Sequence, residues 1–460
     1  MKKNKRTYSR REFVKQNSIA GAGAYLTLGA APSIFAGNLQ HTETPAILGG
    51  NPVRTASWPE WPVWNPETDE KRLLETIRSG VWSRADTVSE FEEKWAATVG
   101  AKRCLTTGNG TNALIGALAN LDIGGGHEVI VPPYTFIATI QAILMNGAMP
   151  VFVDTDPETF QIDVNKIEEK ITSRTKAILP VHILGLPADM VRIMEIAQKH
   201  GLLVVEDACQ AWLAEINHQK VGTFGNAGCF SFQNSKHLAM GEGGAIVSND
   251  EEYMDRCFSY HGFGQSYGSV TAERGEDWVK MGTKLRITEF QAAIGLSQLK
   301  RLEEDTHLRN ENAGYLRSQI ESIPGIIPYN LYENVTRAAF HLFPFRYKKE
   351  DFKDLTRAQF LRAMQAEGIP CSSGYRTLND QPFLADAFQS VNFQKMYPQS
   401  MLDYNSYLED NQCPQNDQLC NEEAVWLSQT LLLGTRSDCD DIANAIEKIH
   451  MNAENIKNNI

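Results

Sequence analysis

A glycine-rich segment, Thr107-Gly108-Asn109-Gly110-Thr111-Asn112, joins an apolar strand-like run to a helical pattern. Glycine lets the backbone approach an anion closely, and the start of a helix offers unpaired N–H groups and the positive end of the helix dipole. The segment is therefore suited to holding a phosphate group. An ordinary tight turn would explain the same residues about as well.

Two acidic residues, Glu206 and Asp207, end a second apolar run and precede Ala208-Cys209-Gln210. A carboxylate at the exit of a parallel strand is costly unless it has a cationic partner. A pyridine nitrogen would be such a partner, because the carboxylate keeps it protonated and the ring electron-withdrawing. The alternative is an acid that caps the next helix.

A single lysine, Lys236, stands in the polar turn Gln233–His237 after the apolar run Cys229–Phe232. A partly desolvated lysine loses its proton more readily, and its neutral amine is a nucleophile for Schiff-base chemistry. Ser231, five residues earlier, could present its hydroxyl to a phosphate. The alternative is a solvent-exposed lysine in a loop.

The order of these segments favours one shared site. A phosphate-type turn, an aromatic residue after a strand (Phe136), an acid at a strand exit (Asp207) and the Ser231 and Lys236 pair follow one another along the chain. Together they describe a pyridoxal-phosphate site, with a phosphate anchor, a ring stack, a pyridine partner and a lysine for the Schiff base.

The elements that must position these residues are short apolar runs separated by amphipathic stretches such as Ala188–His200. The predicted strands are 103–107, 128–131, 151–154, 177–181, 202–206, 229–232 and 245–248. Strand–helix alternation predicts an α/β fold with a mostly parallel, seven-stranded sheet wrapped by helices on both faces. Ligands of such sheets bind at the carboxyl ends of the strands, where the segments above lie.

The pattern changes after a long helix predicted near 288–319. A strand-like run at 340–347 and helices near 356–367 and 438–452 predict a smaller α+β lobe. We therefore expect a large cofactor-binding domain over 45–300, with a Trp- and Pro-rich N-terminal arm, and a small C-terminal domain over 301–460.

The motifs resemble those of the DegT/DnrJ/EryC1/StrS family, the pyridoxal-phosphate-dependent sugar and cyclitol aminotransferases of fold type I. The resemblance covers about residues 45–450. It rests on the segments 107–114, 128–139, 180–189, 206–211, 230–237, 241–245 and 286–293.

The resemblance implies a role for each matching residue. Lys236 would bind pyridoxal phosphate as a Schiff base and later shuttle a proton. Asp207 would pair with the pyridine N–H, Gln210 would contact the ring hydroxyl, and Phe136 would stack on the ring. The residues implied to hold the phosphate are Gly110, Thr111 and Ser231.

The resemblance also implies an obligate homodimer with shared sites, in which the segment around Arg286 reaches the neighbour's phosphate. The family usually has asparagine in a Gly-x-Asn-x-Arg motif, whereas this chain has Lys284 at that position. A lysine could still meet a phosphate as a point charge. We expect Lys284 and Arg286 to be cofactor contacts, and we consider His182 and His261 as candidate substrate contacts. The alternative is that both histidines serve only the structure, His182 near the core and His261 in a loop.

Residues 1–36 are predicted to be a twin-arginine export signal. Ser9-Arg10-Arg11-Glu12-Phe13-Val14-Lys15 matches the motif, and an apolar stretch over 19–31 and small residues near 33–36 follow it. This stretch is too short for a stable membrane span, which needs about 20 residues. The prediction is export, with a periplasmic destination. The resemblance implies relatives that mostly make antibiotic or envelope sugars in the cytosol, where nucleotide sugars are found, so export also puts a nucleotide-linked substrate in doubt.

Composition and charge exclude other classes of function. The 460 residues carry a net charge of −12, and the first 36 hold seven Lys/Arg against one Glu, so the rest of the chain is still more acidic. Such a chain repels phosphate backbones, which argues against nucleic-acid binding. The eight cysteines form no C-x-x-C pair, so no metal site is expected, and no later segment is long and apolar enough to span a membrane.

The leading hypothesis is an aminotransferase that takes an amino group from Glu or Gln and places it on a keto-sugar or keto-cyclitol. One alternative is a pyridoxal-phosphate-dependent sugar dehydratase, although such enzymes carry histidine where this chain has Lys236. The other is an exported, non-catalytic homologue that binds or senses sugars.

Overall fold

The seven predicted strands form the central sheet of the computed structural model, which describes residues 44–273 and 275–460. The predicted export signal lies outside these residues. In spatial order the strands are β1 (Arg103–Thr107), β9 (Gly244–Ser248), β8 (Ala227–Ser231), β5 (Leu203–Asp207), β4 (Thr175–Ile178), β2 (Glu128–Val131) and β3 (Met149–Phe152). Only β9 runs antiparallel to its neighbours, so the mostly parallel sheet is confirmed.

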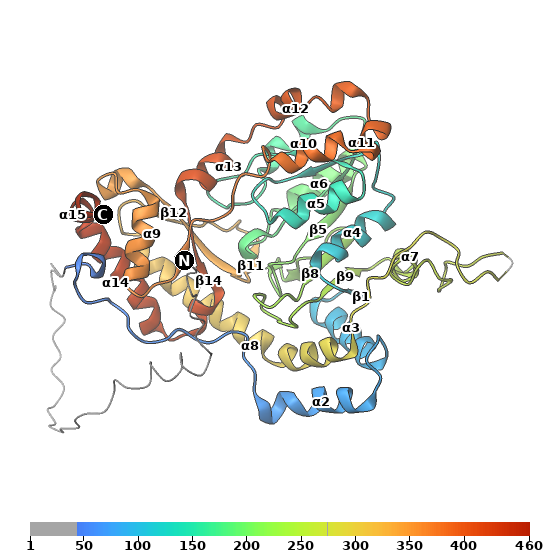
Figure 1. Cartoon of the computed structure of the whole chain (residues 1–460), viewed down its shortest axis with the longest axis horizontal. Helices are drawn as coiled ribbons and strands as arrows, with labels where there is room; N and C mark the ends of the chain where they lie inside the picture. The colour runs from blue at the N-terminus through green and yellow to red at the C-terminus, as the bar shows by residue number, and fades with distance from the viewer. Residues whose placement is uncertain (1–43, 274) are drawn as a thin grey trace, which may run out of the picture. The chain divides into compact units, whose positions relative to one another are not determined.

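Helices cover both faces of this sheet (Figure 1). In β2, Val129 and Val131 belong to one hydrophobic cluster and Ile130 to the other, because successive side chains of a strand point to opposite faces. A sheet buried on both sides gives continuous apolar runs, which is why the strands could be located in the sequence. The first cluster includes α4 (Gly110–Asn120), α5 (Ile137–Met145) and α7 (Glu251–His261), and the second includes α3 (Asp86–Val99) and α6 (Met190–His200).

The C-terminal part of the chain builds a second, antiparallel sheet. Its order is β10 (Ile326–Pro328), β12 (Leu342–Tyr347), β14 (Ala424–Ser428) and β13 (Cys371–Ser372). The helices of this part are α9 (Arg357–Ala366), α14 (Arg436–Met451) and α15 (Ala453–Asn459). A small third sheet joins β6 (Glu215–Ile216) and β7 (Gln219–Lys220) to β11 (Val335–Arg337).

The predicted boundary at residue 300 falls inside the continuous helix α8 (Glu289–Ile320). The helices α10 (Pro382–Gln389), α11 (Val391–Met396), α12 (Tyr404–Asp410) and α13 (Pro414–Gln418) return to the first sheet. There the Tyr407 hydroxyl donates to Pro150 O at 2.7 Å, and Phe152 N donates to Asn411 Oδ1 at 2.7 Å. These contacts cover the edge strand β3, which would otherwise present unpaired backbone groups.

The N-terminal arm, residues 44–65, packs against later segments of the same chain and leads into α2 (Pro66–Ser79) and α3. Arg54 Nη1 donates to Asp441 Oδ2 at 2.8 Å, and Trp58 Nε1 donates to Gly368 O at 2.9 Å. Further along, Trp61 Nε1 donates to Asn234 O at 3.0 Å. The arm therefore connects the C-terminal part with the turn that carries Lys236.

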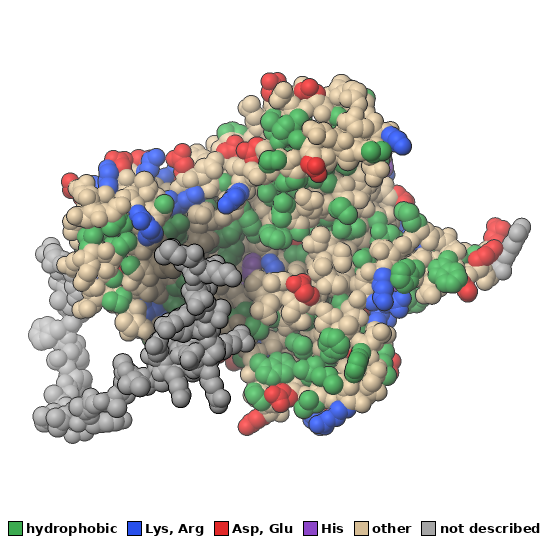
Figure 2. All heavy atoms as spheres, in the orientation of Figure 1, with side chains coloured by type: hydrophobic (Ala, Val, Ile, Leu, Met, Phe, Trp, Pro, Cys, Tyr) green, Lys and Arg blue, Asp and Glu red, His purple; other side chains and the backbone are tan. Residues whose placement is uncertain are grey.

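Acidic and basic side chains are interspersed over the face of the molecule shown in Figure 2. Within residues 44–273 and 275–460, no helix is long and apolar enough to cross a bilayer. The same residues contain no cluster of three or more His, Cys, Asp or Glu side chains that could hold a metal ion.

Candidate active site

A cavity of about 580 Å³ lies where five strands of the central sheet end. Its wall includes the segments that follow β1, β2 and β4, together with the last residues of β5 and β8. This is the edge at which parallel sheets bind ligands. The structure brings to this one cavity seven of the predicted residues, Gly110, Thr111, Phe136, Asp207, Gln210, Ser231 and Lys236.

The phosphate end of the cavity is the start of α4. Asn109 caps this helix, since its Oδ1 accepts a hydrogen bond from Asn112 N at 2.8 Å. A Cβ atom on Gly110 would lie 2.8 Å from both Ser231 Cβ and Cys209 Sγ, so only glycine fits between β8 and the loop after β5. The helix N–H groups and the Ser231 hydroxyl therefore face one small space, which suits a phosphate.

The two adjacent acids of β5 have different surroundings. Glu206 is fully buried and accepts hydrogen bonds from Gly222 N, Phe224 N and Gly225 N at 2.7–2.8 Å. Asp207 lines the cavity, and its oxygens accept from Thr139 Oγ1 at 2.8 Å and Cys209 N at 3.1 Å. Glu206 therefore stabilises the fold, and Asp207 is the carboxylate that a protonated pyridine could meet.

Gln210 has both ends of its amide fixed. Its Oε1 accepts from Leu184 N at 2.9 Å, and its Nε2 donates to the Tyr375 hydroxyl at 2.7 Å. Phe136 precedes α5 and is 57% exposed, although it lines the cavity. A large aromatic side chain that is open on the cavity side can stack on a planar ring.

Lys236 lies in the turn after β8, with its backbone N–H bonded to Gln233 O at 2.8 Å. The residue is half-buried and lines the cavity. Burial lowers the pKa of this amine, although Cys209 and Asp207 oppose the effect. A lowered pKa increases the fraction of neutral, nucleophilic amine.

Four predicted contacts lie outside this cavity. His182 is fully buried, with Nε2 3.0 Å from Glu206 Oε2 and Nδ1 accepting from Ala188 N, so it is a core residue rather than a substrate contact. His261 is 2% exposed, Nδ1 lies 2.5 Å from Phe258 O, and burial lowers its pKa to about 4. Neither histidine lines the cavity of this chain, and both have the buried surroundings of a structural role.

Lys284 and Arg286 are exposed and do not line the cavity of their own chain. Leu285, which stands between them, accepts a 2.7 Å hydrogen bond at its carbonyl from Gly108 N. The segment thus runs beside the phosphate turn but directs both cations elsewhere. A contact with the cofactor would require a second subunit.

Sequence reasoning missed several residues of the cavity wall: Thr139, His341, Tyr375 and Trp426. Three of them come from the C-terminal part of the chain, beyond residue 340. No spacing in the sequence links them to Lys236. Only the packing of the second sheet against the first brings them there.

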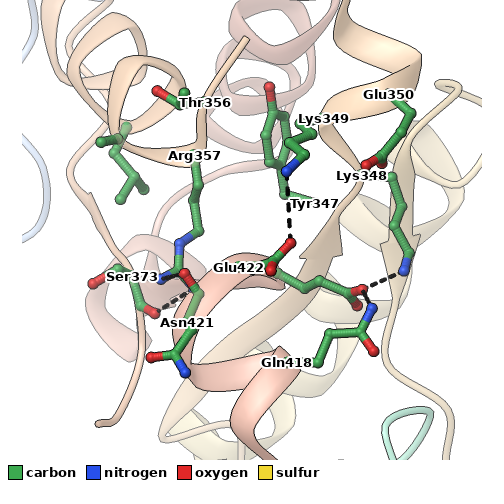
Figure 3. A pocket seen from close by; sticks show the side chains of 13 residues that line it. Tyr347, Lys348, Lys349, Glu350, Thr356, Arg357, Ser373, Gln418, Asn421 and Glu422 are labelled. Atoms are coloured by element: carbon green, nitrogen blue, oxygen red, sulfur yellow. Dashed lines mark hydrogen bonds and ion pairs between the residues drawn. The ribbon is translucent and has the colours of Figure 1, made fainter. Parts of the chain in front are cut away.

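A second hollow, of about 570 Å³, lies on the C-terminal part between β12, α9 and the segment before β14 (Figure 3). Its charged side chains pair with one another, as Lys348 does with Glu423 and Lys349 with Glu422. Arg357 donates to five backbone carbonyls, those of Ser373, Leu419, Cys420, Asn421 and Ala424. These ion pairs and hydrogen bonds stabilise the C-terminal part of the chain. We therefore assign the chemistry to the first cavity.

The first cavity fits pyridoxal phosphate. Its phosphate end excludes even a methyl group at Gly110, its far side presents the fixed Asp207 carboxylate, and Lys236 supplies the amine. Fold and site together define a pyridoxal-phosphate-dependent enzyme of fold type I.

Comparison with known proteins identifies the family. The DegT/DnrJ/EryC1/StrS aminotransferase family matches residues 65–446. The chain therefore belongs to this family and is an aminotransferase, as the sequence motifs predicted.

Individual relatives agree with this assignment. An L-glutamine:2-deoxy-scyllo-inosose aminotransferase of Streptomyces paromomycinus is 32% identical over 429 residues, covering 89% of this chain and 98% of the relative. The spore coat polysaccharide biosynthesis protein SpsC of Bacillus subtilis is 38% identical over 302 residues, covering 65% and 77%. The crystal structure of an aminotransferase from Psychrobacter cryohalolentis matches with a TM-score of 0.74 at 30% identity, covering 86% of this chain and all of that one.

Proposed function

We propose that the protein transfers an amino group from glutamine or glutamate to the ketone of a sugar or cyclitol. The observation that carries this proposal is that the Lys236 amine, the Asp207 carboxylate and the start of α4 face one cavity. The donor and acceptor classes are supported by the relatives named glutamine:scyllo-inosose aminotransferases, which are 30–34% identical to this chain.

Each of the chain's residues in the cavity has a separate role. Pyridoxal phosphate, when bound, supplies an electron-withdrawing ring that stabilises negative charge at the carbon bearing the amine. Asp207, oriented by Thr139, would keep the ring nitrogen protonated. Lys236 would hold the cofactor and move a proton to or from the reacting carbon. Phe136 would cover the ring and exclude water.

The lining of the cavity favours an uncharged polyhydroxy ring. Tyr375, Trp426 and Gln233 offer aromatic faces and a neutral amide, which suit the C–H faces and hydroxyls of such a ring. Among the described lining residues, Lys236 is the only lysine or arginine, and Glu242 adds a carboxylate. A sugar diphosphate would therefore meet no other lysine or arginine of this chain in the cavity.

The experiment that tests the proposal is the absorbance spectrum of the purified protein before and after excess glutamine, glutamate or alanine. The visible band of the bound cofactor should disappear with a true donor. Lys236→Ala should abolish this change, whereas the matched control Lys395→Ala, on an exposed helix, should not affect it. A wild-type protein that binds the cofactor but reacts with no amino acid would instead indicate the non-catalytic alternative.

The dehydratase alternative has less support from the geometry. Lys236 occupies the position at which such enzymes carry histidine. Its neighbour His237 is fully buried, packs against Trp212 with ring centroids 5.0 Å apart, and does not line the cavity. His237 is thus not placed to replace the lysine.

A homodimer with shared sites is part of the proposal. Large apolar side chains between residues 262 and 284 are exposed to solvent, with 86% of Met281 and 64% of Trp278 accessible. Phe136, at the cavity, is exposed as well. Exposed apolar groups of this size often mark an interface. Mixing Lys236→Ala chains with Arg286→Ala chains should restore partial activity if each site combines residues of two subunits; no recovery in a proven mixed dimer would contradict sharing.

Export by the twin-arginine route is the last element of the proposal, supported by the Ser9–Lys15 motif. Replacement of Arg10 and Arg11 by lysine should retain the protein in the cytosol of its native host. Fractionation and immunoblotting would show this. Equal periplasmic amounts with and without the two arginines would contradict it.

A further inference from the structure

His341 lies beside the Lys236 amine. It immediately precedes β12, lines the cavity, and places its Nε2 atom 3.3 Å from Lys236 Nζ. The residue is only 7% exposed. Its other ring nitrogen, Nδ1, has no hydrogen-bond partner among the described residues. Among the described residues, the contact with Lys236 is therefore the ring hydrogen bond that an apolar side chain at position 341 could not make.

The direction of this hydrogen bond follows from the donors available. When Lys236 is an ammonium it has three donors and no acceptor, so Nε2 then accepts and the imidazole is neutral. Burial lowers the pKa of His341 well below its usual value, and Lys236 and Arg309 lower it further. The ring is therefore a neutral acceptor at physiological pH.

One side chain holds the two segments that meet at this contact. Gln429, which follows β14, donates from its backbone N to His341 O at 3.2 Å and from Nε2 to Ser235 O at 3.4 Å. Its Oε1 accepts from Arg309 Nε of α8 at 2.8 Å. The Lys236 turn and the start of β12 are thus fixed relative to α8.

The charged and titratable groups around the contact come from several elements. Asp207 of β5 and Cys209 after it act on Lys236. His237 and Arg309 surround His341, and the His237 and His341 ring centroids are 5.8 Å apart. Burial lowers the pKa of His237 as well, with further lowering by Arg309. The fixed positive charge near His341 is therefore that of Arg309.

We propose that His341 is a positioning residue for Lys236, which accepts a hydrogen bond from the free amine and holds it at the cavity wall while the cofactor carries the substrate's amino group. A free lysine side chain has several rotatable bonds. Without this hydrogen bond it would adopt many conformations, including ones that point away from the cavity. The inference rests on the proposed function only in taking Lys236 as the cofactor lysine.

The test is competitive acetylation of the full-length apoprotein with trace acetic anhydride over a pH series, with the Lys236 peptide quantified by mass spectrometry and exposed Lys395 as internal reference. His341→Phe should move the midpoint of Lys236 labelling to lower pH by about one pH unit, because the ammonium loses its acceptor. His341→Gln retains an acceptor oxygen and should recover at least half of this shift. An unchanged midpoint in His341→Phe, or equal shifts in both variants, would overturn the proposal.

A second measurement does not depend on the folding of His341→Phe. In apoprotein labelled with ¹⁵N-histidine, the Nε2 resonance of His341, assigned by its absence from His341→Gln, should change in Lys236→Met. An identical resonance in wild type and Lys236→Met would show that no hydrogen bond joins the two side chains. Both measurements use apoprotein, so they stay informative even where no amino donor reacts with the loaded enzyme.

Discussion

The Thr139 hydroxyl donates a 2.8 Å hydrogen bond to Asp207 Oδ2, which fixes a carboxylate that β5 delivers to the cavity. The Cys209 amide donates to the other oxygen at 3.1 Å. Because both oxygens are hydrogen-bonded, the carboxylate of Asp207 is already oriented and can pair with a pyridine nitrogen without a change of rotamer. The geometry of one acid is thus set by α5 and by the loop after β5 together.

Asp207→Asn should weaken binding of pyridoxal phosphate by about 10- to 1000-fold, because the neutral amide no longer stabilises a protonated ring nitrogen. Thr139→Val should cost about 10-fold, since the charge stays while its orienting bond is lost. Titration of apoprotein with the cofactor, followed by absorbance, measures both. Asp189→Asn is the matched control: it keeps a capping side chain on α6, away from the cavity, and should bind like wild type. Wild-type affinity in Asp207→Asn would refute the assignment.

Glu206→Gln should lower the free energy of unfolding by roughly 3 kcal/mol. The carboxylate accepts three backbone hydrogen bonds and lies 3.0 Å from His182 Nε2, and the amide nitrogen that replaces one of its oxygens cannot accept the bonds made to that oxygen. Urea denaturation followed by circular dichroism gives the value. A loss of cofactor affinity without a loss of stability would show that the two acids have been assigned the wrong way round.

Gly110→Ala should reduce cofactor affinity and destabilise the fold by roughly 1–3 kcal/mol, since its Cβ atom would lie 2.8 Å from Ser231 Cβ and Cys209 Sγ. Gly314→Ala is the matched control within a helix. Nothing lies within 4 Å of a Cβ atom at position 314, so this change should stabilise α8 by about 1 kcal/mol. Thermal unfolding with and without pyridoxal phosphate separates the two effects. If Gly110→Ala kept wild-type affinity, the close approach at the phosphate end would not matter for binding.

Glu289 should make stability depend on pH in the acidic range. Its carboxylate accepts from Ala85 N, Thr87 N and Val88 N at 2.7–3.0 Å, at the start of α3. Burial raises its pKa, but the hydrogen bonds from Thr87, Val88 and Ala85 outweigh this effect and lower the pKa overall. A folded-state pKa below the unfolded value means that the stabilisation is complete above the unfolded pKa, about 4.3, and is lost as pH falls through the folded pKa.

Glu289→Gln should therefore cost about 1–2 kcal/mol at neutral pH, and the difference from wild type should shrink on acidification. Urea denaturation of both proteins over a pH series measures this convergence. A difference that stayed constant with pH would mean that the charge of Glu289 contributes nothing.

The strands of the central sheet could be located closely because their signal is local. The predicted runs 103–107 and 128–131 coincide with β1 and β2, and the run 151–154 overlaps β3 but is shifted by two residues toward the C-terminus. The limits of β3 are less clear in sequence because the apolar run continues to Val153, past the point at which pairing with β2 ends. The return of helices α10–α13 to the first sheet could not be predicted from a local pattern, since the chain had left that sheet long before.

The sequence by itself determined which chemistry the protein performs, because the glycine turn, the acid at a strand exit and the lysine turn each require particular residue types close together in the chain. The motifs pointed to Asp207 as the acid of the site, and the tertiary structure shows the physical reason, since Asp207 lines the cavity and Glu206 is buried in the core. Glu206 and Asp207 are neighbours on β5, and successive side chains of a strand point to opposite faces. Only the tertiary structure decided that His341, rather than His182 or His261, lies beside Lys236, because that contact joins two sheets whose strands are more than a hundred residues apart.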